Sequence, residues 1–577
     1  MTASLRVLRR TAAASNPYSP AGLHPVVQRV LAARGVRSAA ELDTSLGGML
    51  RPEGLSNIER AVALLADALA AQRRICIVAD YDADGATSCA LGLRALRAFG
   101  ARHVDFLVPN RFEYGYGLTP PIVELALARG AELLVTVDNG ISSIEGVAAA
   151  KAAGLAVLVT DHHLPGAELP PADAIVNPNL PGDGFASKAL AGVGVMFYVL
   201  VALRAHLRST GWFSKQALAE PNLAAWLDLV ALGTVADVAV LDANNRRLVA
   251  QGLARLRGGR GTAGLMALCR ASGREPERLQ ASDLGFRLGP RLNAAGRLAD
   301  MALGIQLLTS DDPAACDRMA RELDAMNLER REIEADMKAR ALAIVERLPR
   351  DEASALPSGI CLFDPGWHQG VTGIVASRVK DLHHRPTVVF AKASDSELKG
   401  SARSIPGVHI RDVLERVATR HPGLITRFGG HAMAAGLALE TSALARFGAA
   451  FAAEIERVAA PELLERVMLT DGELAPADFS LVLARQLREA GPWGQGFPEP
   501  MFDGFFGISA RRVVGEQHLK LQLSDGGRVG LDAIAFNAAQ APWAREATRI
   551  HAVFRLDINE WQGAESLQLV IEHASAA

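Results

Sequence analysis

Short apolar runs alternate with longer stretches rich in Ala and Leu through the first half of the chain. Each run is the length of a buried strand, and the stretches between them keep apolar residues at helical spacing. This alternation predicts βαβ units and a mostly parallel sheet buried on both faces. The predicted strands are Arg74–Ala79, His103–Val108, Leu133–Val137, Ala156–Thr160 and Ala174–Val176.

The second half changes pattern twice. Residues 314 to about 347 are laced with charges, lack Gly and Pro, and keep apolar residues at helical spacing, which predicts one long connecting helix. A second α/β unit follows, with predicted strands at Ile360–Phe363 and Thr387–Phe390.

The last hundred or so residues predict five short strands in succession. This count fits a small antiparallel barrel of the oligonucleotide-binding (OB) kind, and a plain sandwich fits nearly as well. These strands are Phe505–Val514, Leu519–Leu523, Leu531–Phe536, His551–Leu556 and Ser566–Ile571.

A chain of 577 residues is too long for one hydrophobic core, so we expect several domains in a multidomain α/β protein. The start of the chain bears Arg, lacks acids and superficially resembles a transit peptide, but we interpret it as a basic N-terminal arm. The predicted division is an arm at 1–53, a parallel-sheet domain at 54–313, a connecting helix at 314–348, a second α/β domain at 349–464 and an OB-like barrel at 465–577.

Composition narrows the class of protein only slightly. Sixty-one basic and 63 acidic residues give a net charge of −2, so any surface that binds nucleic acid must be local. The five cysteines are scattered without a CxxC pair, which is typical of reduced thiols in a cytoplasmic protein rather than of disulfides or a zinc site. No apolar run is long enough to predict a membrane span.

Acidic residues follow the predicted strands at the point where each strand ends. Asp80, Asp82 and Asp84 come after the first strand, Asp138 after the third, and Asp161 with His162 and His163 after the fourth. The carboxyl ends of parallel strands meet along one edge of a sheet, so these side chains are expected to converge. Asp237, after a helical stretch, is a candidate to complete the set.

The spacing of Asp80, Asp82, Asp84 and Gly85 also matches the first half of a calcium-binding EF-hand loop. That loop needs a bidentate Glu at its twelfth position, where this chain has Leu91, and it follows a helix rather than a strand. The EF-hand interpretation is therefore excluded.

Clustered carboxylates repel one another and need a compensating cation. Carboxylates with imidazole and no thiolate favour hard or borderline ions such as Mn²⁺ or Mg²⁺. A shared Asp between two ions is the arrangement that paired-metal sites use for phosphoryl chemistry. The pattern thus predicts two divalent cations.

The segments Asp80–Gly85, Val137–Gly140, Asp161–His163 and Gly233–Asp237, in this order, resemble the DHH phosphoesterase superfamily and, within it, the RecJ family of bacterial single-strand-specific exonucleases. Further segments resemble the same family along nearly the whole chain: Gly289–Arg297, Gly366–Val371, Gly400–Ser404, Phe428–His431 and Gly494–Pro500.

The resemblance implies a role for each matching residue. Asp82 and Asp138 would bind the first ion; Asp84, Asp138, His162 and Asp237 would bind the second, with Asp138 bridging. Asp80 would assist at the rim, and His163 would contact the scissile phosphate. The residues expected to bind substrate phosphates are Arg291, Arg297, Ser401, Arg403 and His431.

One position departs from the family pattern. Relatives often carry His two residues before the first Asp of the motif, where this chain has Val78. We therefore expect the first ion to be held more weakly or to depend on Asp80.

By this resemblance the chain is a metal-dependent 5′→3′ exonuclease that hydrolyses single-stranded DNA to 5′-mononucleotides in repair and recombination. It would be a monomeric cytoplasmic enzyme working with a single-strand-binding protein and a RecQ-type helicase. Two alternatives stay open: a DHH phosphodiesterase acting on short oligonucleotides or cyclic dinucleotides, and a non-catalytic scaffold that binds single strands.

Overall fold

The computed structural model describes residues 5–11, 22–110, 114–348, 356–525 and 529–577. These residues form two compact units. The larger unit takes its residues from 9–326 and 470–577, and the smaller unit from 5–8 and 327–469. Parts of the predicted N-terminal arm and the start of the predicted second domain, 349–355, lie outside the described residues.

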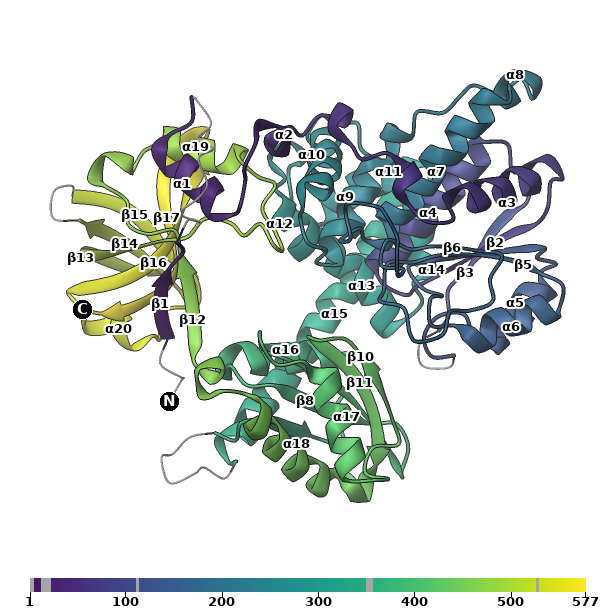
Figure 1. Cartoon of the computed structure of the whole chain (residues 1–577). Helices are drawn as coiled ribbons and strands as arrows, with labels where there is room; N and C mark the ends of the chain where they lie inside the picture. Colours follow the sequence, from purple (N-terminus) through teal and green to yellow (C-terminus); the bar gives the residue numbers. More distant parts are fainter. Residues whose placement is uncertain (1–4, 12–21, 111–113, 349–355, 526–528) are drawn as a thin grey trace. The chain divides into compact units, whose positions relative to one another are not determined.

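A five-stranded sheet lies in the first part of the larger unit (Figure 1). Its order is β3-β2-β4-β5-β6, and every neighbouring pair is parallel, which confirms the predicted parallel sheet. Three predicted strands match residue for residue, and the other two are shorter at their ends. The strands are β2 (Ile75–Ala79), β3 (Val104–Leu107), β4 (Leu133–Val137), β5 (Ala156–Thr160) and β6 (Ala174–Val176).

The two faces of this sheet are buried by different sets of helices, because successive side chains of a strand point to opposite faces. On β2, Ile75, Ile77 and Ala79 belong to a large core with the helices α3, α4, α7 and α9. Cys76 and Val78 belong to a smaller core with α5 and α6 on the other face. Continuous apolar strands are what burial on both faces requires.

The helices of the larger unit that precede the barrel are mostly short. Their bounds are α1 (Pro25–Ala33), α2 (Ala39–Leu42), α3 (Ile58–Ala70), α4 (Ala83–Ala98), α5 (Pro120–Ala128), α6 (Ile144–Ala152), α7 (Gly192–Ser209), α8 (Trp212–Lys215), α9 (Leu227–Ala236), α10 (Ala243–Arg257), α11 (Ala263–Ala271), α12 (Ala281–Asp283), α13 (Gly289–Leu298) and α14 (Ala302–Thr309).

The C-terminal strands close into a barrel of order β13-β14-β15-β17-β16, so the OB-like alternative is confirmed over the sandwich. All five predicted strands are present, the last two extended to thirteen residues each. Phe502 and Phe506 are buried in the core of the larger unit, and each ring packs against that of Phe554. The elements are β13 (Phe502–Val514), β14 (His518–Ser524), β15 (Val529–Ala535), β16 (Arg549–Trp561) and β17 (Ala564–Ala576), with α19 (Leu481–Glu489) and α20 (Pro542–Glu546).

The smaller unit holds a mixed sheet of order β10-β11-β9-β8-β7, in which only β7 and β8 are parallel. Helices α17 and α18 bury one face of this sheet, and α16 with the end of α15 buries the other. The bounds are β7 (Ile360–Phe363), β8 (Thr387–Lys392), β9 (Glu397–Arg403), β10 (Arg427–Gly430), β11 (Ala434–Glu440), α16 (Thr372–His383), α17 (Ile410–Arg420) and α18 (Leu444–Val458).

Three elements span the division between the units: α15, β1 and β12. The long helix α15 (Pro313–Glu346) confirms the predicted connecting helix, and the division falls within it, after Met326. The strand β1 (Leu5–Arg9) pairs with β12 (Arg466–Thr470). Within the described part of the chain, no helix is both long and apolar enough to cross a membrane.

Candidate metal centre

The acidic residues that follow the strands lie at one edge of the larger unit's sheet. Ala79 is in register with Val137, and Val137 with Thr160, so Asp80, Asp138 and Asp161 each occupy the first position after a strand. Their backbones continue the ladder: the amide of Asp138 donates to the carbonyl of Thr160 over 3.1 Å. The convergence predicted from the sequence therefore follows from strand register.

Asp82 and Asp84 are placed by the start of α4. Asp82 caps this helix, and its Oδ1 accepts a hydrogen bond from the Gly85 amide over 3.0 Å. Gly85 has to be glycine, because a Cβ there would lie 2.5 Å from the carbonyl oxygen of Asp80. The tight turn brings the three acids of the segment to one side of the sheet edge.

The carboxylate of Asp84 is fully buried and bound by the N-terminus of α7. The amides of Gly192 and Val193 donate to its two oxygens over 2.6 and 3.0 Å. Free amides at a helix N-terminus favour negative charge. The pKa of Asp84 is nevertheless raised to about 7, because burial and the charge of Asp82 outweigh these two bonds.

Asp138 lies at the middle of the cluster and is 2% exposed. Its backbone is left-handed, with φ of 60°, so the chain turns sharply at the end of β4. Its Oδ1 lies 3.0 Å from Nε2 of His162. Burial, and then the charges of Asp84 and Asp82, raise the pKa of Asp138 well above its usual range.

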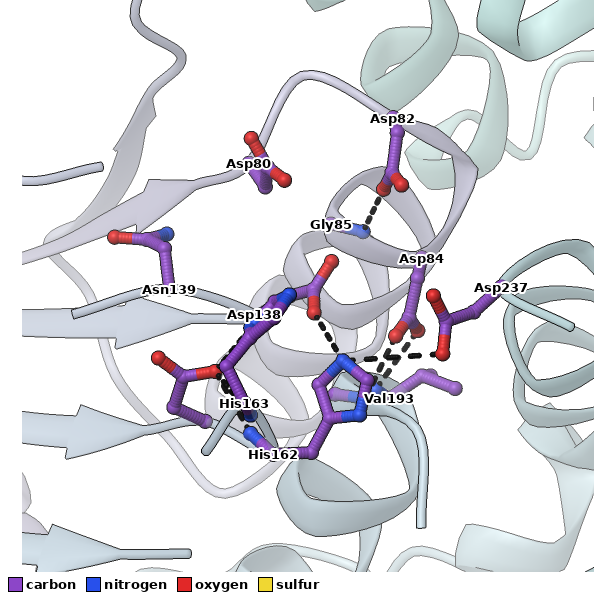
Figure 2. Close-up of polar contacts among 12 residues, drawn as sticks. Asp80, Asp82, Asp84, Gly85, Asp138, Asn139, His162, His163, Val193 and Asp237 are labelled. Carbon is purple, nitrogen blue, oxygen red and sulfur yellow. Dashed lines mark hydrogen bonds and ion pairs between the residues drawn. The ribbon is translucent and has the colours of Figure 1, made fainter. Parts of the chain in front are cut away.

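Asp237 comes from the end of α9 and completes the group. Its Oδ2 lies 3.8 Å from Nε2 of His162, which Figure 2 shows between Asp138 and Asp237. Gly233 lets α9 approach, because a Cβ there would lie 2.7 Å from Oδ1 of Asp84. Burial, and then the charges of Asp84 and Asp82, raise the pKa of Asp237 well above its usual range.

His163 and Asp161 form a pair beside the carboxylates. Asp161 Oδ1 lies 2.7 Å from Nδ1 of His163, and its carboxylate also accepts hydrogen bonds from the amides of Ile141, His162 and His163. Burial lowers the pKa of His163, but the hydrogen bond and charge of Asp161 outweigh it and raise the pKa to about 9. His163 is therefore an imidazolium at neutral pH when no cation is near.

The donor set fits divalent cations. Ligand atoms lie within 4.8 Å of one another in three groups, of which one is Asp80, Asp82 and Asp138 and another is Asp84, His162 and Asp237. The third is Asp138 with His162 and His163. Neighbouring ligands of one octahedral ion with bonds of ~2.1 Å lie about 3 Å apart, close to the spacing of His162 and Asp138. A divalent cation bound among these carboxylates would offset their mutual repulsion and favour their charged forms.

Of the residues predicted to bind phosphates, two belong to α13 in the larger unit. The Asn293 side chain of this helix accepts from the Ala83 amide over 2.7 Å, and a Cβ at Gly296 would lie 1.9 Å from the carbonyl oxygen of Tyr81. Arg297 follows Gly296 in the sequence of α13, and its role with phosphate stays a prediction. Arg291 forms an ion pair with Asp324. Its Nε and Nη2 lie 2.9 and 2.8 Å from the same oxygen, Oδ1. Its role with phosphate likewise stays a prediction.

The other three belong to the smaller unit. Ser401 and Arg403 lie two residues apart on β9, and both adjoin the N-terminus of α16. The Ser401 hydroxyl is 2.9 Å from that of Thr372, and a Cβ at Gly373 would lie 2.6 Å from Nη2 of Arg403. An arginine, a hydroxyl and a helix N-terminus together favour an anion. His431, in the turn between β10 and β11, is near the position where Ala434 pairs with Arg403.

Several groups that position the cluster were not predicted from the sequence. Asn139 is fully buried, and its side chain donates to the carbonyls of Val78 and Val137 over 3.0 and 2.8 Å, joining two strand ends. The Tyr116 hydroxyl donates to the carbonyl of Asp138 over 3.2 Å. Asn139 belongs to the segment Val137–Gly140, so its position in this motif could have marked it as important. Nothing in the sequence around Gly192 and Val193 indicates that their amides bind Asp84.

Three family models match the chain. The DHH family N-terminal domain matches residues 74–234, the DHHA1 domain matches 356–457, and the RecJ OB domain matches 470–573. The matches cover the parallel sheet, the sheet of the smaller unit and the barrel.

Relatives and solved structures match over the whole chain. A single-stranded-DNA-specific exonuclease RecJ from Salmonella typhimurium is 52% identical over 569 residues, which cover 98% of each protein. The crystal structure of RecJ from Thermus thermophilus in complex with Mn²⁺ is 31% identical, with a TM-score of 0.81, and covers 99% of this chain and 79% of that one. The structure of the same protein in complex with Mg²⁺ is 30% identical, with a TM-score of 0.75, covering 99% and 78%.

An identity of this size over the full length leaves no large part of the chain unmatched. The order of the matched models agrees with the order of sheet, second α/β unit and barrel in the fold. The chain therefore belongs to the RecJ family of single-stranded-DNA-specific exonucleases.

Proposed function

We propose that this chain is a metal-dependent exonuclease that degrades single-stranded DNA from the 5′ end and releases 5′-mononucleotides, in DNA repair and recombination. The observation that carries the proposal is the cluster of Asp80, Asp82, Asp84, Asp138, His162 and Asp237 at the sheet edge, in a chain of the RecJ family. The barrel supports a nucleic-acid substrate, because OB folds bind single strands along a groove with stacking platforms.

Two groups of ligands support two cations, Mn²⁺ or Mg²⁺. Asp82 and Asp138, with Asp80 at the rim, would hold the first, and Asp84, His162 and Asp237, with Asp138 shared, would hold the second. When bound, such cations activate a water molecule and neutralise the oxygens of a phosphodiester.

The chain's own residues would do the remaining work. His163, whose pKa Asp161 raises, would in its protonated form donate to an oxygen of the scissile phosphate. Ser401, Arg403 and the N-terminus of α16 suit a phosphate at the end of the strand, with His431 beside them. Arg291 and Arg297, both on α13, would contribute further positive charge toward the phosphates, although Arg291 also pairs with Asp324.

Two alternative functions are less well supported by the structure. A phosphodiesterase for short oligonucleotides or cyclic dinucleotides needs only the two α/β parts, so the closed barrel favours a longer strand. A scaffold without activity has no need of a full ligand set. The proposal extends to a monomer in the cytoplasm, and the free state of all five cysteines supports a reducing compartment. It also includes cooperation with a single-strand-binding protein and a RecQ-type helicase.

The direct test is digestion of single strands labelled at the 5′ or the 3′ end, a blunt duplex and a cyclic dinucleotide, each with Mn²⁺, Mg²⁺ or EDTA. We expect metal-dependent release of the 5′-terminal mononucleotide from the single strand alone. Activity that survives EDTA, or equal activity on the duplex, would contradict the proposal.

The matched variants are Asp138→Ala and Asp105→Ala. Asp138 is shared between two ligand groups, so its loss should lower turnover by more than the ~10–100-fold typical of groups that only orient metal ligands, while the fold persists. Asp105 is an exposed acid paired with Arg129, and its loss should leave the rate unchanged. Near-normal turnover by Asp138→Ala would remove this residue as the shared ligand.

A further inference from the structure

Two candidate ligands of the second cation depend on loops rather than on strands. Asp84 is held by the amides of Gly192 and Val193, which follow the loop that ends at Ala191. Asp237 is the C-terminal cap of α9, and the loop that starts at Val238 leads away from it. The separation of these two carboxylates therefore depends on what fixes the two loops against each other.

The side chain of Asn245, in the first turn of α10, joins these loops. Its Nδ2 donates to the carbonyl of Ala189 over 2.7 Å and to the carbonyl of Val240 over 2.9 Å. Ala189 precedes Gly192 by three residues, and Val240 follows Asp237 by three. One amide group thus bridges the chain that binds Asp84 and the chain that carries Asp237.

Burial and the polarity of its partners fix the orientation of the Asn245 side-chain amide. Asn245 is fully buried, so its two donors have no water to replace the carbonyls. Both partners are carbonyl oxygens, which accept only, so the amide nitrogen must face them and not the amide oxygen. Its backbone is fixed as well, because the Asn245 amide donates to Oδ1 of Asp242, which caps α10, over 2.8 Å.

The loop after Asp237 contains a strained residue, Val238, which depends on contacts from its surroundings. Val238 has a left-handed backbone with φ of 59°, in the position where helices usually end with glycine. A β-branched residue in this region is strained and persists only when its surroundings hold it. Two hydrogen bonds hold this loop in place. The Asn245 side chain donates to the Val240 carbonyl, and the Leu241 amide donates to the Gln495 carbonyl over 2.7 Å.

We propose that Asn245 is a positioning residue for the second cation, which sets the spacing of Asp84 and Asp237 through the loops at Ala189 and Val240. The inference rests on the proposed function, since it concerns the cations of that site. Groups that orient metal ligands from behind typically change metal affinity ~10–100-fold when they are lost. The loops that Asn245 joins adjoin Asp84 and Asp237, which are ligands of the second cation only, so binding of the first cation should be unaffected.

Asn244 offers a matched control on the same helix. It is also buried, at 3% exposure, but its Oδ1 accepts from the Leu50 amide over 3.2 Å and from the Tyr198 hydroxyl over 2.8 Å. A purely structural role would make Asn245→Ala and Asn244→Ala behave alike. A positioning role separates them.

The experiment titrates Mn²⁺ into the full-length chain freed of metal, with heat and the electron spin resonance of free Mn²⁺ as readouts. For the wild type we expect two ions per chain. Asn245→Ala should bind the first as the wild type does and the second about 10–100-fold more weakly. Asn244→Ala should bind both ions normally while melting at a lower temperature. In nuclease assays Asn245→Ala should need more Mn²⁺ for half-maximal kcat, with an unchanged KM for DNA.

Normal binding of the second ion by folded Asn245→Ala, or equal weakening in Asn244→Ala, would overturn the inference and leave the proposed function intact. A wild-type chain that binds no Mn²⁺ would instead overturn the proposed function. Circular dichroism establishes folding, and if Asn245→Ala does not fold, Asn245→Ser, which keeps one donor, decides by the same criterion.

Discussion

Two aspartates in equivalent sequence positions, Asp161 and Asp138, each the first residue after a strand, have different chemistry in the fold. Burial raises the pKa of Asp161, but the hydrogen bond and charge of His163 outweigh it and hold the pKa below its usual range. Asp138, surrounded by other carboxylates, has a pKa well above its usual range. The first of these is suited to orient a histidine, and the second is suited to bind a cation.

The pair of Asp161 and His163 predicts a pH dependence. A raised pKa means that the imidazolium persists at neutral pH and is lost as pH rises through that pKa, about 9 without cations and lower with cations bound nearby. If His163 donates to the phosphate, kcat/KM on a single-stranded oligonucleotide should fall along an alkaline limb at that pKa.

Asp161→Asn removes the charge that raises this pKa, so its limb should move toward the ordinary pKa of histidine, ~6.5. His163→Gln should lower kcat/KM and abolish the limb. A limb that stays in place in Asp161→Asn would show that another group titrates.

At the scale of elements, the centre depends on close approach of helices. Gly233 lets α9 pass Asp84, and at Gly192 a Cβ would lie 2.6 Å from Cβ of Asp138. The end of α9 is a Schellman turn: the Val238 amide donates to the Val235 carbonyl over 3.1 Å and the Ala239 amide to the Thr234 carbonyl over 3.2 Å. Val238 occupies the position where glycine is preferred, and its side chain is 62% exposed.

This turn predicts the effect of Val238→Gly. A left-handed backbone costs a residue with a Cβ about 1–2 kcal/mol, and the exposed side chain contributes little packing. After the added entropy of glycine in the unfolded chain, we expect the variant to be more stable by about 1 kcal/mol, measured as a higher melting temperature.

Val240 in the same loop provides the comparison, because its backbone does not have a positive φ. Val240→Gly should lower the melting temperature, since it adds flexibility without relieving strain. If the two variants shift the melting temperature in the same direction, backbone strain at Val238 is not the cause.

At the scale of the whole molecule, the two units have separate hydrophobic cores, and the candidate ligands for the cations all lie in the larger one. A ligand that binds only the folded state stabilises it, by ~2.7 kcal/mol at a hundred times its dissociation constant. Calorimetry should therefore show Mn²⁺ raising the melting temperature of the larger unit and leaving that of the smaller unit unchanged.

The sign of the pH effect follows from the raised pKa of Asp84, about 7. Without cations this group costs the larger unit stability progressively as pH rises from ~4, its unfolded pKa, through about 7. Protons compete with Mn²⁺ below pH 7, so the Mn²⁺ shift should be larger at pH 8 than at pH 6. Asp138→Ala should abolish it, and a persisting shift would place the cation elsewhere.

The fold could be predicted largely from the sequence because its strands are short apolar runs with clear ends. Burial of the sheet on both faces makes those runs continuous, and β4, β5 and β6 begin and end where the runs do. The barrel strands extend beyond the predicted ones, since alternating residues on exposed strands carry a weaker signal.

What the sequence determined by itself is the set of acids and histidines and their place after strands, since strand ends are local properties of the chain. Only the tertiary structure decided that Asp84 accepts hydrogen bonds from the amides of Gly192 and Val193. The same holds for the ion pair of Arg291 with Asp324 and for the two loops that Asn245 joins. These contacts join residues far apart along the chain, and their geometry depends on packing that no local pattern encodes.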